Sequence, residues 1–158
     1  MSIDSREFRN ALGRFATGVC VITANPDGHA PFGMTVNSFA SVSLDPPLVL
    51  WSLQNNSECY PAFELANGFT VNVLAHDQQH LSNLYAKKGD HALREDHYRL
   101  GRNGHPILLG ALTSFECSTH AWHEGGDHKI LVGKVEDVID RPTGRPLVFY
   151  SGAYGEIR

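Results

Sequence analysis

Cysteine, positive charge and long apolar runs are all scarce in this chain of 158 residues. The three cysteines, Cys20, Cys59 and Cys117, lie far apart and form no Cys-x-x-Cys pair, so the sequence indicates neither a disulfide framework nor a thiolate zinc site. No run approaches the roughly 20 apolar residues that span a bilayer, and the N-terminus lacks the apolar core of a signal peptide. We therefore expect buried free thiols in a soluble, cytoplasmic protein with no membrane partner.

Basic patches and phosphate-binding glycine loops are missing as well. The formal net charge is −4 and the isoelectric point is near 6.1, with no local cluster of lysine and arginine, so nucleic acid is not an expected partner. Neither Gly-x-Gly-x-x-Gly nor Gly-x-x-x-x-Gly-Lys-Ser/Thr occurs. A dinucleotide would have to bind to this chain in another way.

What is present fits a single domain that spans residues 1–158. Hydrophobic residues make up 42 % of the chain and charged residues 19 %, which is a globular composition slightly poor in charge. This balance is consistent with a surface partly covered by another subunit or a cofactor. No internal repeat or low-complexity linker divides the chain.

Most of the predicted elements are strands. A first helix is expected from Asp4 or Ser5 to near Gly18, and short helices are expected after Ser57 and after Asp77. Residues 87–106 combine many charges with turn formers, which predicts a long surface excursion. The packing face of the first helix consists of Phe8, Leu12 and Phe15. The strands are expected at residues 19–24, 32–44, 48–53, 69–75, 111–122, 129–140 and 146–152.

Six or seven strands without regular strand–helix alternation predict a mainly β fold. We expect an antiparallel barrel with a few short helices in the connections, not a doubly wound parallel sheet. One face of the strand at residues 32–44 carries Thr35, Asn37, Ser41 and Ser43, which are polar but uncharged, together with Phe39. Small neutral hydrogen-bonding groups indicate contact with a ligand, although threonine and serine are also common on exposed strands, and the alternation alone leaves both interpretations open.

Nine histidines invite a metal hypothesis, because His120, His123 and His128 surround one turn. On a continuous strand His120 and His123 point to opposite faces, and no cysteine completes a tetrahedral set, although Glu124 or Asp127 could serve as a third ligand. We predict no metal site. No local signature of a Ser/His/Asp or Cys/His assembly supports covalent catalysis.

Six segments in order resemble the short-chain flavin reductase family. They are "FATGVCVIT", "GMTVNSFASVSLDPPLVL", "FTVNVLA", "GALTSFEC", "GGDHKILVGKV" and "LVFYSGAYG", and together they cover nearly the whole chain. The resemblance implies an FMN-binding split β-barrel of Greek-key type, usually a homodimer. It also implies a reductase that transfers a hydride from NADH or NADPH to FMN or FAD and often supplies reduced flavin to a separate monooxygenase.

The resemblance also implies roles for individual residues. Thr35, Asn37 and Ser38 match the segment that lies along the flavin ring, and the residues leading into the helix after Ser57 are expected to offer backbone N–H groups to the flavin phosphate. Glu58 departs from the family pattern there, because a carboxylate repels a phosphate. The full set of expected cofactor contacts is Thr35, Val36, Asn37, Ser38, Ser52, Leu53, Gln54, Asn55, Ser57, Asn72, His80 and Tyr154.

His128 is the expected catalytic residue on the nicotinamide side. In the family the Gly-Asp-His turn lies near the flavin face, where a histidine can hydrogen-bond the carboxamide or the diphosphate of the nicotinamide cofactor. Tyr154 is expected in the wall of the nicotinamide pocket, although Ala153 replaces the basic residue that often precedes this tyrosine. The alternative role for His128 is an exposed side chain in a turn that Asp127 supports.

Two other classes of protein stay open at this point. The same barrel is used by proteins that bind flavin or haem and carry electrons without turning over NADH, but the complete Gly-Gly-Asp-His turn favours the enzyme. A ligand-free interaction module would purify without the yellow colour of a flavin.

Overall fold

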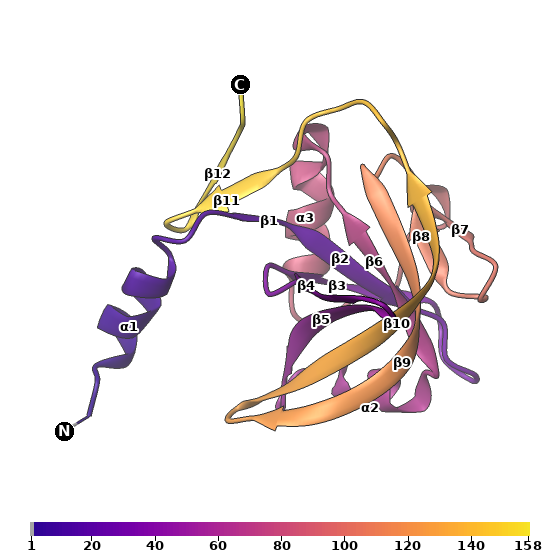
Figure 1. Cartoon of the computed structure of the whole chain (residues 1–158), viewed down its shortest axis with the longest axis horizontal. Coiled ribbons are helices and arrows are strands. Elements are labelled where there is room, and N and C mark those ends of the chain that lie inside the picture. Colours follow the sequence, from indigo (N-terminus) through magenta and orange to yellow (C-terminus); the bar gives the residue numbers. More distant parts are fainter. Residues whose placement is uncertain (1) are drawn as a thin grey trace.

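The computed structural model describes residues 2–158 and is built around one curved antiparallel sheet of seven strands (Figure 1). The spatial order of the strands is β3-β2-β6-β9-β10-β5-β4. The edge strands β3 and β4 are not hydrogen-bonded to each other although they follow each other in the chain, so the sheet curls without closing, as in a split barrel. The bounds are β2 Cys20–Ala24, β3 Phe32–Val36, β4 Ala40–Leu44, β5 Pro47–Gln54, β6 Gly68–Val73, β9 Thr113–Gly125 and β10 His128–Asp140.

Smaller elements surround the main sheet. A three-stranded sheet has the order β1-β11-β12, and β7 pairs with β8. The helix α3 contacts β3 and β2 of the main sheet. The bounds are β1 Thr17–Gly18, β7 Tyr98–Leu100, β8 Pro106–Leu108, β11 Val148–Tyr150, β12 Ala153–Gly155, α1 Ser5–Leu12, α2 Tyr60–Leu65 and α3 Gln79–Ala86, with 3-10 turns η1 His76–Gln78 and η2 Glu95–His97.

The sheet buries side chains on both of its faces. Alternate residues of β2 enter two different apolar clusters, with Ile22 in one and Val21 in the other. The first cluster centres on Trp51, whose ring meets those of Phe63 and Phe69 edge to face at centroid distances of 4.9 and 5.6 Å. This double burial explains why β2 reads as a continuous apolar run.

The first helix begins as expected but does not pack on its own chain. The Asp4 carboxylate accepts hydrogen bonds from the backbone N–H groups of Arg6 and Glu7, so the predicted cap is confirmed. The helix ends at Leu12 and extends away from the sheet (Figure 1). The side chains of its expected packing face stay exposed, at 54 % for Phe8, 59 % for Leu12 and 78 % for Phe15, so the prediction of a face packed within this chain is wrong.

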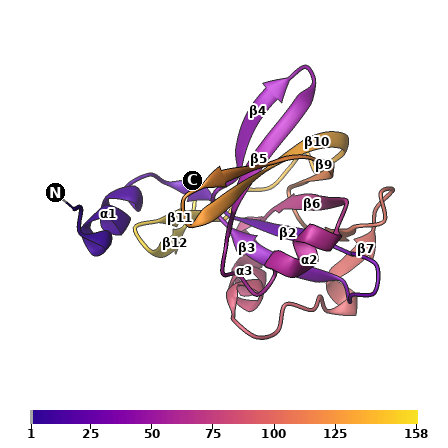
Figure 2. The same cartoon turned by 90° about the horizontal axis from the view of Figure 1, so that it is seen from below.

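The expected strand at residues 32–44 is broken at residues 37–39. β3 pairs with β2 at one edge of the sheet, whereas β4 pairs with β5 at the other edge, in a hairpin that projects from the body (Figure 2). Ser41 and Ser43 therefore do not continue the face of Thr35. The chain turns back between Leu44 and Pro47, at the Asp-Pro-Pro sequence where the strand was expected to stop.

Three further expectations about elements are corrected. Residues 87–106 are not entirely a loop, because they contain β7 and the start of β8, whose Ile107 and Leu108 are buried. β9 and β10 are longer than expected, so only Gly126 and Asp127 separate them. The short strand β12 was not expected at all.

None of the helices in residues 2–158 has the length and hydropathy that crossing a bilayer requires.

Candidate active site

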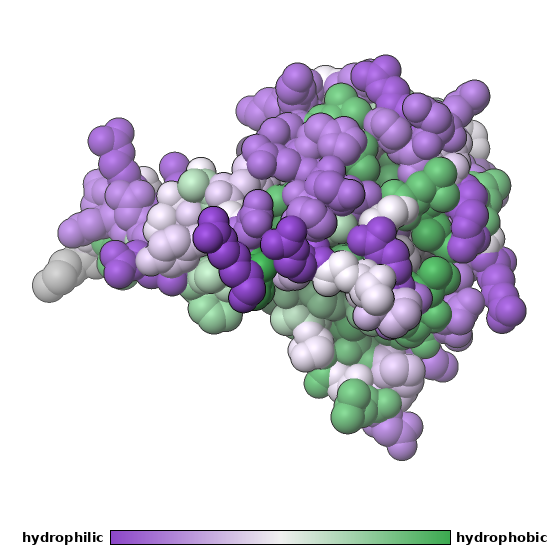
Figure 3. Space-filling view, turned by 90° about the horizontal axis from the view of Figure 1, so that it is seen from above, coloured by the Kyte–Doolittle hydropathy of each residue, from purple (hydrophilic) through white to green (hydrophobic). Residues whose placement is uncertain are grey.

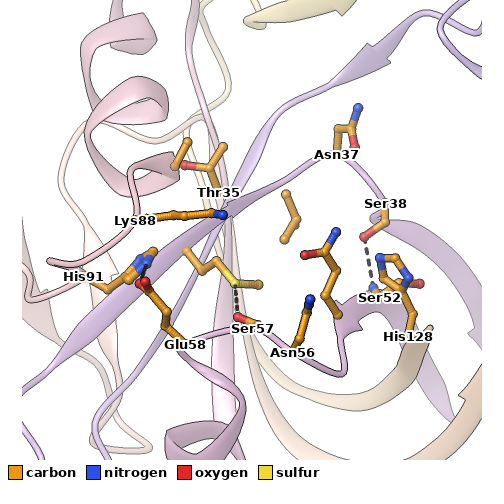
Figure 4. Close-up of a pocket in the computed structure, with 14 residues that line it drawn as sticks. Thr35, Asn37, Ser38, Ser52, Asn56, Ser57, Glu58, Lys88, His91 and His128 are labelled. Carbon is orange, nitrogen blue, oxygen red and sulfur yellow. Dashed lines mark hydrogen bonds and ion pairs between the residues drawn. The ribbon is translucent and has the colours of Figure 1, made fainter. Parts of the chain in front are cut away.

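A cavity of about 480 Å³ lies where four segments of the chain meet (Figure 4). They are β3 with the residues after it, the end of β5 with the loop to α2, the loop after α3, and the start of β10. The volume lies within the range of small-molecule sites. The lining residues are Met34, Thr35, Val36, Asn37, Ser38, Ser52, Gln54, Asn56, Ser57, Glu58, Ala86, Lys88, His91 and His128.

The β3 side of the cavity is neutral and its hydroxyl groups are oriented by the protein. Thr35 donates its hydroxyl proton to the backbone carbonyl of Ser82 at 2.7 Å. The Ser38 hydroxyl oxygen accepts a hydrogen bond from the backbone N–H of Ser52 at 2.9 Å. Thr35 can therefore only accept a further hydrogen bond, while the Ser38 hydroxyl keeps its proton for a ligand.

The loop between β5 and α2 uses its own backbone N–H groups. The Ser57 N–H bonds the Gln54 carbonyl, the Cys59 N–H bonds the Ser57 hydroxyl, and the Tyr60 N–H bonds the Ser57 carbonyl, at 3.1 to 3.2 Å. The expectation that this helix start offers free N–H groups to a phosphate is therefore wrong for these three residues. Gln54 and Ser57 still border the cavity, as expected.

The cation at the cavity comes from a segment that the sequence did not single out. Lys88 and His91, from the loop after α3, lie beside Glu58 on one side of the cavity, and Ser38, Ser52 and His128 lie on the opposite side (Figure 4). Sequence reasoning did not predict Lys88 and His91 as cavity residues, because residues 87–106 have the composition of a solvated loop. The only available signal was a pair of lysines directly after a helix with an apolar stripe.

His128 borders the cavity at the end of β10, paired in register with Gln54 of β5. Its Nδ1 is 2.7 Å from the Asp127 carboxylate, and this hydrogen bond holds the pKa of Asp127 below its usual value. Asn55 supports the same turn, because its backbone N–H bonds the Asp127 carbonyl and its side chain donates to the Gly126 carbonyl. Asn55 itself is absent from the cavity wall, so its expected contact with a cofactor is replaced by this supporting role.

The side chains of three other expected contact residues lie away from the main cavity, and their contacts stay predictions. The Leu53 side chain is fully buried in the core, because on β5 it alternates with Ser52 and Gln54. Asn72 is also fully buried, and its amide bonds four groups of the protein: the Val21 carbonyl, the Thr23 hydroxyl, the Leu108 N–H and the Ser114 hydroxyl. His80 borders a different cavity of about 250 Å³, near Asp96 and Arg141.

Tyr154 borders a smaller cavity of about 230 Å³ that shares Thr35, Val36 and Asn37 with the main one. Its hydroxyl is 2.7 Å from that of Ser82 and donates to Asn83 at 3.1 Å. The two cavities therefore adjoin each other at the end of β3, and the expectation that Tyr154 lines the nicotinamide pocket stays a prediction.

The arrangement is suited to binding and orienting a ligand. Within residues 2–158 no group of three or more histidine, cysteine, aspartate or glutamate side chains is placed to hold a metal ion. The thiol nearest the cavity, that of Cys59, is buried, and its burial raises its pKa to about 12, so it is not an activated nucleophile. Neutral hydrogen-bonding groups along the strand and a cation at one end suit an elongated ligand with a polar ring and an anionic tail.

Comparisons with known proteins agree with this geometry. Residues 12–158 match the family model described as a flavin reductase like domain. The chain is 50 % identical over 153 residues to the FMN reductase (NADH) SmoA of Agrobacterium fabrum, an alignment that covers 96 % of this chain and 86 % of that protein. It is 39 % identical to HsaB of Rhodococcus jostii, the reductase subunit of a flavin-dependent monooxygenase, over 97 % of this chain and 78 % of that one.

Solved structures give the same result. The flavin reductase PheA2 in its native state is 36 % identical with a TM-score of 0.88, and the match covers 99 % of both chains. The NADH:FAD oxidoreductase SgcE6 of Streptomyces globisporus, in complex with NAD and FAD fragments, is 32 % identical with a TM-score of 0.92, covering all of this chain and 97 % of that one. The chain therefore belongs to the flavin reductase-like family and has the split β-barrel fold of its members.

Proposed function

We propose that this chain is an NAD(P)H:flavin oxidoreductase, which transfers a hydride from NADH or NADPH to FMN or FAD. The observation that carries the proposal is the neutral wall of Thr35 to Ser38, which lies between the cationic Lys88 on one side and His128 on the other. The relatives named for NADH-dependent reduction of FMN or FAD support it. No comparable support exists for an electron carrier that does not turn over NADH.

The residues of β3 fit the edge of a flavin ring. An isoalloxazine edge presents carbonyl oxygens and one imide N–H, which match a hydroxyl donor at Ser38 and an acceptor at Thr35. Lys88 supplies a positive charge for the phosphate. A flavin held there supplies the hydride acceptor.

His128 is placed to orient the nicotinamide cofactor. Because Asp127 accepts from Nδ1–H, the neutral imidazole presents the lone pair of Nε2, which can accept a hydrogen bond from a carboxamide N–H. Direct hydride transfer needs alignment of two rings more than it needs an acid or a base, so the chain contributes geometry.

The decisive assay follows the oxidation of NADH and NADPH with FMN and with FAD, in all four pairings. We expect turnover that depends on added or bound flavin. A well-folded preparation that oxidises neither nicotinamide with either flavin would exclude this function.

We further propose that the reduced flavin passes to a separate monooxygenase component. HsaB is named as the reductase subunit of a flavin-dependent monooxygenase, and a relative from Acinetobacter baylyi as the reductase component of a flavin-dependent trigonelline monooxygenase. Release of reduced flavin into solution, trapped by a flavin-dependent monooxygenase that lacks its own reductase, is the expected result. Retention of all reduced flavin on the reductase would contradict it.

A homodimer with the flavin near the interface is also proposed. The exposed apolar face of α1 supports it, as does the projecting β4–β5 hairpin, where Val42 and Leu44 are exposed and hydrophobic surface is visible (Figure 3). The occupant of both surfaces would be a second copy of the chain. Light scattering should give about twice the chain mass of 17.4 kDa.

A further inference from the structure

A carboxylate lies at the end of the main cavity where the flavin phosphate is expected. Glu58 borders this cavity together with Lys88 and His91 (Figure 4). A phosphate placed near Lys88 would also meet the negative charge of Glu58, which lowers its affinity unless that charge is neutralised. The cavity therefore needs a partner for Glu58 whenever it binds a phosphorylated ligand.

The structure supplies that partner in His91. The Glu58 carboxylate oxygen Oε2 is 3.2 Å from Nε2 of His91 and accepts the backbone N–H of Gly89 at 2.7 Å. The other ring nitrogen, Nδ1, lies 3.1 Å from the carbonyl oxygen of Gly33. His91 thus lies between a carboxylate and a carbonyl, and its side chain is only 14 % exposed.

Both neighbours of the His91 ring can only accept hydrogen bonds. A neutral imidazole carries one N–H and can satisfy one of them, whereas the imidazolium carries two and satisfies both. When His91 releases its proton to solvent, one contact is lost and Glu58 keeps an uncompensated charge.

Few other ionisable groups face this pair. β3, on which the loop packs, carries none, and the Cys59 thiol stays neutral because burial raises its pKa to about 12. On its own loop His91 is flanked by Lys87, Lys88 and Asp90, and the Asp90 carboxylate accepts from the Ala92 N–H. Among residues 2–158 the acidic group in an ion pair with His91 is Glu58.

We propose that Glu58 and His91 together set the preference of this cavity for phosphorylated flavins over riboflavin. Protonated His91 neutralises the carboxylate and leaves Lys88 available to the phosphate; neutral His91 leaves the carboxylate to oppose it. The inference rests on the proposed flavin site and adds a determinant of specificity to it.

The test measures dissociation constants of FMN and riboflavin for the full-length apoprotein by fluorescence titration, at about pH 6 and about pH 8, on either side of the range in which histidine charge usually changes. Riboflavin reports any effect at the ring, including that of His128. In Glu58→Gln, we expect the ratio of the riboflavin to the FMN dissociation constant to exceed that of the wild type by about tenfold at the higher pH, a moderate factor because Glu58 is half exposed and screened. At the lower pH the ratio of the wild type should in turn exceed that of His91→Asn by a similar factor, because only the wild type can then neutralise Glu58 with a protonated histidine.

Two further variants make the result unambiguous. His91→Asn, which cannot be protonated, should keep a low ratio at both pH values, and it decides the matter even where Glu58→Gln folds poorly. Glu64→Gln removes an exposed charge from α2 that does not border this cavity, and it should behave as the wild type. A gap between the wild type and His91→Asn of equal size at both pH values, or no gap between them at either, overturns the proposal. Failure of both flavins to bind would instead refute the flavin site itself.

Discussion

Single side chains of the cavity have their hydrogen-bonding direction fixed before a ligand arrives. The Thr35 hydroxyl donates a hydrogen bond to the Ser82 carbonyl, the Ser38 hydroxyl accepts one from the Ser52 N–H, and His128 is held through Nδ1 by Asp127. These hydrogen bonds hold the remaining donor or acceptor of each side chain in position, so binding a ligand costs little side-chain entropy. Changes at these positions should alter specific steps of the reaction and leave the fold intact.

His128→Ala is expected to weaken the complex with the nicotinamide cofactor and to spare flavin affinity. The loss of one hydrogen bond to a polar or charged group should lower kcat/KM for NADH by roughly tenfold to a hundredfold. Steady-state kinetics together with flavin titration measure both effects. A variant that loses flavin affinity but keeps its NADH kinetics would assign His128 to the flavin site.

Asn37→Ala is the contrasting variant, because Asn37 borders the cavity from the flavin side. Its flavin dissociation constant should rise by about tenfold, the value of one neutral hydrogen bond at its upper range, and its turnover should recover when flavin is raised. Kinetics at several flavin concentrations measure this recovery. Turnover that stays low at saturating flavin would place Asn37 in the hydride-transfer step.

At this scale the sequence identified the wall of the cavity better than its charged end. Thr35, Asn37 and Ser38 follow one another closely in the sequence, and both they and His128 were expected through short motifs that resemble the family. Lys88 and His91 approach only because the loop after α3 runs antiparallel to β3, with the Gly33 N–H bonded to the His91 carbonyl. No local pattern encodes such a contact.

Strands and helices are tied together by a few buried polar groups, and Asn72 is the clearest example. Its amide connects β6 to β2 through Val21 and Thr23, to β8 through Leu108 and to β9 through Ser114. Because Asn72 and these partner residues are buried, removal of the amide leaves several of their polar groups without partners.

Asn72→Ala should therefore destabilise the protein by roughly 3 kcal/mol while leaving flavin affinity unchanged in the folded fraction. Urea denaturation with and without flavin measures both quantities. Asn10→Ala, at an exposed position of α1, is the matched control and should change stability by less than about 0.5 kcal/mol. If Asn72→Ala kept its full stability but lost flavin affinity, Asn72 would be assigned to the cofactor site.

Elements with continuous apolar patterns were predictable, and those that depend on tertiary pairing were not. The strands β2 and β6 and the long pair β9 and β10 were expected near their observed positions. β7 and β12 have three residues each, and both owe their strand conformation to one neighbour, β8 and β11 respectively. The break after Val36 also escaped prediction, although the alternation is reversed at Ser38 and Phe39, because it resumes at Ala40 and one continuous strand was expected.

The whole molecule carries two projections, α1 and the β4 hairpin, whose exposed apolar side chains do not enter its own core. A single chain with such surfaces should associate, and we assign the association to a second copy. Replacing Phe8 and Leu12 together by serine should convert a dimer to a species near 17.4 kDa without loss of β structure, because neither side chain is buried in its own chain.

Light scattering and circular dichroism check this expectation. Arg9→Ser, on the same helix, is the control and should remain dimeric. A wild-type protein that is monomeric and fully active at micromolar concentration would refute the dimer.

The break at residues 37–39 connects flavin binding with subunit association, two equilibria that are usually measured separately. Asn37 and Ser38 belong to the cavity wall, and the next residues lead into the hairpin proposed to meet the second subunit. By linkage, any factor by which flavin tightens subunit association must equal the factor by which association tightens flavin. The concentration of the reductase itself would then control how long reduced flavin is retained: dilution releases it, and crowding of many copies around a monooxygenase keeps it bound.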